Sequence, residues 1–251
     1  MSGAYSSERV LREYLLFHYG AESEILSLGL GPREGLGFAE RTVTELLDAS
    51  SLPEEGANGL DLGCAVGRSS FELARHCLEV TGIDFSLNFI RVAEVLRDTG
   101  ELAYEYVTQG ERLASAIARI PKEVDRSRVN FVSGDVCDLP RDCGTFDVVH
   151  AANLLCRLPD PCALLGRLPD LVRPGGQLLL ATPFSWLEEF TPRDKWMGGL
   201  EVTESTEVLK ATLLPSFHLE KEMDLPFLLR EHERKFQYGI SFGTRWRRGE
   251  G

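Results

Sequence analysis

The chain has 251 residues, of which 43% are apolar and 26% are charged. This composition is typical of a globular protein and excludes a disordered or collagen-like polymer. The 27 basic and 39 acidic side chains give a net charge of −12. Such a surface repels phosphate backbones, so we expect no nucleic-acid partner.

No apolar run approaches the roughly 20 residues that span a bilayer, so we expect no membrane partner. The first ten residues lack the basic-then-apolar order of a secretory signal, which predicts a cytoplasmic protein. The six cysteines form no C-x-x-C pair, and reduced thiols are expected in a chain of this length.

The first fifty residues predict a helical arm or lid. Ser7 can cap a helix with apolar residues at helical spacing, and Gly20 ends it. A glycine-rich loop follows, and residues 38–49 predict a second helix.

Residues 58–182 alternate short apolar runs with helical patterns, which predicts a parallel sheet with crossover helices. The strands are expected at 59–62, 79–84, 129–133, 146–151 and 176–182. Residues 100–128 form an unusually long connection, with a predicted helical stretch at 111–120. A lid over the substrate and a harmless surface insertion both remain open for this insertion.

Residues 183–251 form a substrate-side segment in which 217–225 and 236–246 alternate as two strands, expected to pair antiparallel. No domain linker is visible, so the sequence predicts a single domain over residues 1–251.

A cofactor site is indicated by GLDLGCAVGRSSFELARHC at 59–77, where an apolar strand runs through a glycine turn into a helix. Gly63 and Gly67 let the backbone approach a ligand and present N–H groups at the helix start. Ala65 stands where a dinucleotide fingerprint has its second glycine. Cys64 is expected to pack in the turn as a small apolar residue.

Three carboxylates end neighbouring strands and are expected to converge. Asp61 would face a cationic group, while Asp84, followed by Phe85 and Ser86, is placed to grip a ribose diol. Asp135, with Val136 beside it, can accept from an adenine amino group. The implied ligand is an adenosine with a positive group and no phosphates, which is S-adenosyl-L-methionine.

Residues 58–182 resemble the class I methyltransferases. The shared motifs are the D-x-G-x-x-x-G turn, the ribose-binding acid, the G-D-V adenine corner and R-P-G-G-x-L at 173–178. The resemblance implies a Rossmann-like, doubly wound, seven-stranded and mostly parallel α/β sheet with a C-terminal antiparallel hairpin. It also implies S-adenosyl-L-homocysteine as the spent cofactor. A nicotinamide-binding or purely structural Rossmann domain is the alternative.

The flanking regions resemble the 4-mercaptohistidine N1-methyltransferases of ovothiol biosynthesis, found alone or as the C-terminal domain of ovothiol-synthesis enzymes. The stretches concerned are EYLLFHYG at 13–20, the tyrosine-bearing insertion near 104, FSWLEEFTPRDKW at 184–196 and PFLLREHERKFQYG at 226–239. This resemblance implies methylation of an imidazole nitrogen of 5-thiohistidine to give ovothiol A, and association with a sulfoxide synthase. A methyltransferase for another small acceptor and a non-catalytic binding module are the alternatives.

An amino-acid acceptor needs cationic, acidic or carbonyl, and aromatic partners. Arg230 is expected to bind the carboxylate, with His232 beside it in the turn between the final strands, although REHERK could equally be a solvated turn. Asn153, followed by Leu154, is expected to hold the cofactor or orient the acceptor, or to cap a helix. A last set of aromatic and histidine side chains could either line the acceptor pocket or pack in the core: Tyr14, His18, Tyr19, Trp186 and Trp196.

The histidines show no recognised metal-ligand spacing, so no metal is expected. His150 ends a predicted strand and is expected to be a core histidine with a backbone partner.

Overall fold

The computed structural model describes residues 7–200 and 202–250, so the predicted domain limits at residues 1 and 251 lie outside the described part. The helices of that part are α1 (Glu8–Tyr19), α2 (Glu22–Ile25), α3 (Phe38–Thr44), α4 (Arg68–Leu73), α5 (Leu87–Thr99), α6 (Pro161–Leu171) and α7 (Ser205–Leu213). The strands are β1 (Ala57–Leu62), β2 (Cys77–Asp84), β3 (Glu101–Gln109), β4 (Arg112–Arg119), β5 (Val129–Ser133), β6 (Phe146–Ala152), β7 (Val172–Thr182), β8 (Phe217–His232) and β9 (Lys235–Arg248).

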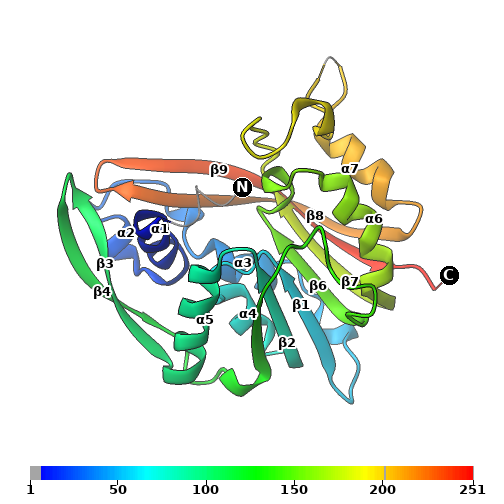
Figure 1. Ribbon diagram of the computed structural model, residues 1–251, viewed down its shortest axis with the longest axis horizontal. Helices are drawn as coiled ribbons and strands as arrows, with labels where there is room; N and C mark the ends of the chain where they lie inside the picture. The colour runs from blue at the N-terminus through cyan, green and yellow to red at the C-terminus, as the bar shows by residue number, and fades with distance from the viewer. Residues whose placement is uncertain (1–6, 201, 251) are drawn as a thin grey trace.

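The main sheet has seven strands in the order β5-β2-β1-β6-β7-β9-β8 (Figure 1). The first five of these pair in parallel, whereas β9 pairs antiparallel with both β7 and β8. The predicted Rossmann-like sheet with a C-terminal antiparallel hairpin is therefore confirmed. The strand order reverses between β1 and β6, and ligands of such sheets bind beyond the carboxyl ends of the strands at this point.

Helices cover both faces of the sheet and so form two hydrophobic cores. Successive side chains of β7 point alternately into one core and the other. Leu179 and Ala181 pack in the core that contains α1, α3, α4 and α5. Leu178 and Leu180 point the other way, into the core that contains α6 and α7. Because successive side chains of a strand face opposite sides, a strand buried on both faces reads as one apolar run.

The predicted first helix is confirmed as α1. The Ser7 hydroxyl accepts a hydrogen bond from the Val10 N–H, and the Gly20 N–H bonds the Leu16 carbonyl where the helix ends. The Tyr19 hydroxyl donates to the carbonyl of Val66 at 2.8 Å. This bond attaches α1 to the glycine turn after β1.

The helix expected at 111–120 is wrong, because residues 101–119 form the antiparallel hairpin β3–β4. Tyr104 and Tyr106 are buried in the same core as α1, which lies beside the hairpin in Figure 1. The alternating pattern ELAYEYVTQ fits a strand buried on one face. The insertion thus supports α1, and none of its residues lines the main pocket.

The two final strands are longer than predicted. β7 ends at Thr182, which pairs with Phe242 and through it with Asp224, whereas β8 continues to His232. The extra length of β8, about 26 Å at ~3.3 Å per residue, carries the hairpin over α1, as Figure 1 shows.

Among the described residues, no helix is long and apolar enough to cross a membrane.

Substitution of Gly67 by alanine should destabilise the fold by about 2 to 4 kcal/mol. Gly67 has φ +85°, and an added Cβ would lie 2.6 Å from the ring of Phe131, so left-handed strain and overpacking both contribute. The matched control is Gly110→Ala, at φ +59° with nothing within 4 Å of the new Cβ, which should cost about 1 kcal/mol or less. Urea unfolding measures both, and equal losses would contradict the close packing at Gly67.

Candidate active site

A cavity of about 760 Å³ lies at the carboxyl ends of the parallel strands. It is lined by α1, α3, the loops after β1, β2, β5, β6 and β7, and the projecting part of β8–β9. The volume lies in the range of small-molecule sites, and the position is the strand-order reversal between β1 and β6.

The glycine turn forms one corner of the cavity. Gly63, Ala65 and Gly67 all have positive φ, of 71°, 47° and 85°. Ala65 therefore adopts the left-handed conformation that a glycine would take, and its N–H donates to the Asp84 carboxylate at 2.9 Å. The backbone of the turn therefore follows the path that a glycine would give it, although alanine replaces the second glycine. The left-handed conformation of Ala65 is locally strained.

Asp84 and Asp135 both line this corner, as predicted for the ends of β2 and β5. The second carboxylate oxygen of Asp84 accepts the Ser86 N–H at 2.8 Å. Burial raises the pKa of Asp84 to about 6, despite these two backbone hydrogen bonds. Of the predicted cofactor residues, those lining the cavity are Gly63, Ala65, Asp84, Phe85, Ser86, Asp135, Val136, Asn153 and Leu154. Cys64 and Gly67 belong to the same turn but do not line the cavity.

The expectation that Asp61 faces a cationic ligand is corrected by its surroundings. The side chain is buried and does not line the cavity. Its oxygens accept from the hydroxyls of Ser69 and Ser70, at 2.7 and 2.6 Å, and lie 2.7 Å from Nδ1 of His150. Burial by itself would raise the pKa of Asp61, but His150 and the two hydroxyls lower it below its usual value. Asp61 is thus satisfied within the fold.

His150 is buried, and its partners are side chains instead of the expected backbone carbonyl. Its Nε2 lies 3.0 Å from the hydroxyl of Thr42, on α3. Both His150 and Thr42 reach the floor of the cavity. No cluster of histidine, cysteine and carboxylate residues in the described part of the chain could hold a metal ion.

Two of the three predicted residues on α1, Tyr14 and His18, line the cavity. Tyr19 does not, since its hydroxyl bonds the glycine turn and burial holds its pKa well above the usual value. Burial lowers the pKa of His18 to about 3, so this ring is neutral near pH 7. Its Nδ1 is a buried atom without a hydrogen-bond partner in the described structure.

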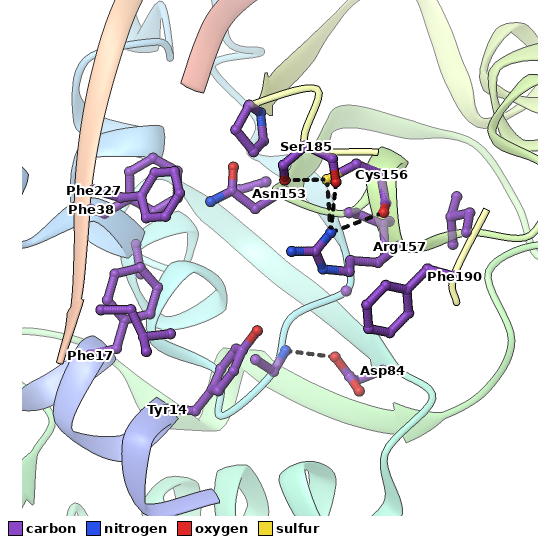
Figure 2. A pocket seen from close by; sticks show the side chains of 18 of the residues that line it. Tyr14, Phe17, Phe38, Asp84, Asn153, Cys156, Arg157, Ser185, Phe190 and Phe227 are labelled. Atoms are coloured by element: carbon purple, nitrogen blue, oxygen red, sulfur yellow. Dashed lines mark hydrogen bonds between the residues drawn. The ribbon is translucent and has the colours of Figure 1, made fainter. Parts of the chain in front are cut away.

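An aromatic wall made by Phe17, Phe38 and Phe227 faces the cavity (Figure 2). Their ring centroids lie 5.4 to 6.5 Å apart, within the range of favourable aromatic pairs. None of the three was predicted from the sequence as a site residue. The helical repeat of Tyr14, Phe17 and His18 was the available signal for the first of them.

Asn153 lines the cavity with a left-handed backbone, φ 52°. Its side-chain oxygen accepts the hydroxyl of Ser241, on β9, at 2.7 Å, which leaves the amide N–H groups for another partner. It does not cap the next turn of helix, because the capping position there belongs to Leu154. Backbone strain of this kind clusters at functional sites.

The structure contradicts the placement of Arg230 in an acceptor pocket. Arg230 is buried on β8, donates to the carbonyls of Glu24 and Ile25, and lies over the ring of Tyr106 at 5.2 Å. Alternation along β8 turns Phe227 and Leu229 toward the cavity and Arg230 away from it. His232 lies still further along the strand, beside a separate groove.

The cation that does line the cavity is Arg157, which was not predicted from the sequence. It follows β6 in a short 3₁₀ turn, and its Nη1 donates to the carbonyls of Cys156 and Ser185 at 3.1 and 3.2 Å. Figure 2 shows its guanidinium between Asn153 and Phe190. Trp186 also lines the cavity, whereas Trp196 does not.

The glycine corner fits S-adenosylmethionine. A strand-end carboxylate with backbone-fixed orientation, Asp84, faces the cavity beside a second one, Asp135. Phe85, Val136 and Leu154 supply apolar surface for a purine, and a side chain at Gly63 would enter the space of Leu154.

The model of a methyltransferase domain matches residues 36–224 of the chain. A curated relative, the ubiquinone biosynthesis O-methyltransferase of Coxiella burnetii, is 28% identical over 128 residues, which are 51% of this chain and 44% of that protein. The corresponding protein of Xanthomonas euvesicatoria is 32% identical over 127 residues, 51% and 43% of the two chains. The matched region thus spans less than half the length of these relatives.

Among solved structures, the N-methyltransferase NodS from Bradyrhizobium japonicum in complex with S-adenosyl-L-homocysteine is similar with a TM-score of 0.52 and 19% identity, over 95% of this chain and 98% of NodS. A SAM-dependent methyltransferase from Methanosarcina mazei reaches 0.55 at 18% identity, over 80% and 97%. These likenesses concern the fold.

The fold and the glycine corner define a class I, S-adenosylmethionine-dependent methyltransferase. The chain belongs to the methyltransferase domain family.

Replacing Asp84 by asparagine should weaken S-adenosyl-L-homocysteine binding about 10- to 100-fold, because a charge-assisted hydrogen bond contributes about 1.5 to 3 kcal/mol. Wild-type affinity should fall below pH 6, where the raised pKa of about 6 leaves Asp84 protonated and less able to accept ribose hydroxyls. Calorimetry from pH 5 to 8 measures both effects. The exposed variant Asp142→Asn is the control, and a flat wild-type profile would remove Asp84 from the ribose site.

Proposed function

We propose that the protein methylates an imidazole nitrogen of 5-thiohistidine, giving ovothiol A and S-adenosyl-L-homocysteine. Besides the glycine corner, the cavity is lined by an aromatic wall, Asn153 and Arg157. Such a set suits a small acceptor with a flat ring and polar groups. The resemblance of the flanking regions to the 4-mercaptohistidine N1-methyltransferases supports the same acceptor, and association with a sulfoxide synthase belongs to this proposal.

The observation that carries the proposal is that, among the described residues lining the cavity beyond the cofactor corner, no buried side chain is available to act as a base. The pKa of His18 is about 3, both ring nitrogens of His150 have partners, and Glu13 is paired with Arg9. Glu189 lies exposed at the rim. A neutral imidazole nitrogen attacks with its own lone pair and needs no base, whereas a phenol must first lose its proton.

S-adenosylmethionine supplies a methyl group on a positively charged sulfur. The residues of this chain have to hold the acceptor nitrogen in line at about 3 to 3.5 Å and exclude water. The phenylalanine wall would exclude water from this part of the cavity, and the neutral His18 adds no positive charge to it. The amide N–H groups of Asn153 can orient the acceptor. In such a transfer the acceptor nitrogen would gain the methyl group, the bond from that carbon to sulfur would break with its electron pair left on sulfur, and the methylated ring would release a proton to solvent.

O-methylation of an aromatic acceptor is the second candidate. The names of the curated relatives and the phenylalanine wall favour it. A bulky apolar acceptor would leave Arg157 and Asn153 without polar partners in the cavity, which is unfavourable for buried polar groups. The first candidate predicts 5-thiohistidine as the acceptor, and the second predicts an aromatic hydroxyl compound.

Incubation with methyl-labelled S-adenosylmethionine and 5-thiohistidine should give a product heavier by one methyl group in place of a hydrogen, with the label on a ring nitrogen. Mass spectrometry detects the product, and NMR distinguishes N- from S-methylation. Histidine without the sulfur and a dihydroxybenzene serve as comparison acceptors. Turnover of the dihydroxybenzene alone would replace the proposal by the O-methyltransferase alternative.

A further inference from the structure

The cavity has an unbalanced charge distribution. Among the described residues that line it, the carboxylates are Glu13, Asp84, Asp135 and Glu189, and Arg157 is the only arginine or lysine. A simple anion would meet mostly repulsion there, whereas a ligand with an ammonium and a carboxylate group can be attracted at both ends. The position of the single cation therefore indicates where a carboxylate can bind.

Arg157 is held in place without being neutralised. Its Nη1 donates to two carbonyl oxygens, and the guanidinium carbon lies 4.8 Å from the ring centroid of Phe190. Within residues 7–200 and 202–250 it forms no ion pair with a carboxylate, whereas Arg68 is paired with Glu40 and Glu72. A guanidinium has five N–H donors, so the edge formed by Nε and Nη2 remains available.

The topology assigns this edge to the acceptor side of the cavity. The cofactor corner is built mainly from residues after β1, β2 and β5, on one side of the strand-order reversal, with Leu154 after β6 packed against Gly63. Arg157 follows β6, and its neighbours Ser185 and Phe190 follow β7, on the other side. Figure 2 shows Arg157 and Asp84 as separate groups that line the same cavity.

We propose that Arg157 binds the α-carboxylate of a zwitterionic amino-acid acceptor through its Nε and Nη2 edge, and so determines acceptor specificity. The inference rests on the proposed function, and it replaces Arg230 as the carboxylate ligand. The planar fork of arginine matches the two oxygens of a carboxylate. The Phe190 ring and the two carbonyls fix the fork before the acceptor arrives, which lowers the entropy cost of binding.

The test compares 5-thiohistidine with 5-thiohistamine, which lacks only the carboxylate. Calorimetry measures binding of each to the protein loaded with S-adenosyl-L-homocysteine, in wild type and in Arg157→Met. The variant should bind 5-thiohistidine about 10- to 100-fold more weakly. It should bind 5-thiohistamine as wild type does, and Arg157→Lys should recover part of the loss. Affinity for S-adenosyl-L-homocysteine should stay within about twofold.

Arg193→Met is the matched control, because Arg193 also lies over an aromatic ring, that of Trp196, but does not line the cavity. Equal loss for both acceptors would show that Arg157 only shapes the cavity. Parallel loss of S-adenosyl-L-homocysteine affinity would assign Arg157 to the cofactor. Either result overturns the inference, as does wild-type protein that binds neither acceptor.

Turnover of the same two acceptors by wild type separates this inference from the proposed function. Arg157-dependent binding of 5-thiohistidine without methyl transfer would support the carboxylate site and reject the proposed reaction. Methyl transfer with equal affinity for both acceptors would support the reaction and reject the carboxylate site.

Discussion

The buried carboxylate of Asp61 is the interaction on which the architecture of the site depends. It lies at the end of β1 and bonds two serines of α4 and His150 of β6, which in turn contacts Thr42 of α3. An ionised group in this position is stable only while its hydrogen bonds are complete, since a buried charge that loses a partner costs about 3 to 5 kcal/mol. The network fixes the glycine turn above it and the floor of the cavity beside it.

The internal bonding of Asp61 leaves a different carboxylate to face the cavity beside the glycine turn. Because Asp61 is hydrogen-bonded within the fold, the acid that faces the cofactor nearest the glycine turn is Asp84. The two carboxylate oxygens of Asp84 already accept two backbone N–H groups. The hydrogen bond from the Ala65 N–H to Asp84 holds the strained turn in its path. Pre-organisation of this kind favours binding, since the loop does not have to be ordered when the cofactor enters.

The cofactor half of the molecule could be predicted from the sequence because its signals are local. Strands buried on both faces give apolar runs, as in β6 and the second half of β7, and Asp84 and Asp135 lie at or just after the ends of strands β2 and β5. The acceptor half depends on quantities that local patterns do not give. RLASAIAR fits a helix or a strand equally well, and a change of one position along β8 decides whether Leu229 or Arg230 faces the cavity. Arg157 lies in an irregular turn, where no periodic pattern identifies a functional side chain.

The long β8–β9 hairpin has a consequence for how the site is assembled. The glycine turn and both acids come from one continuous stretch, residues 57–136, whereas the aromatic wall joins Phe17 and Phe38 to Phe227, near the other end of the described chain. Contacts between such distant positions form late, because their loop-closure entropy is large. On the ribosome, the nucleoside half can therefore fold while the hairpin is still being synthesised. The cavity gains the wall formed by the projecting part of β8–β9 only when β9 has paired with β7.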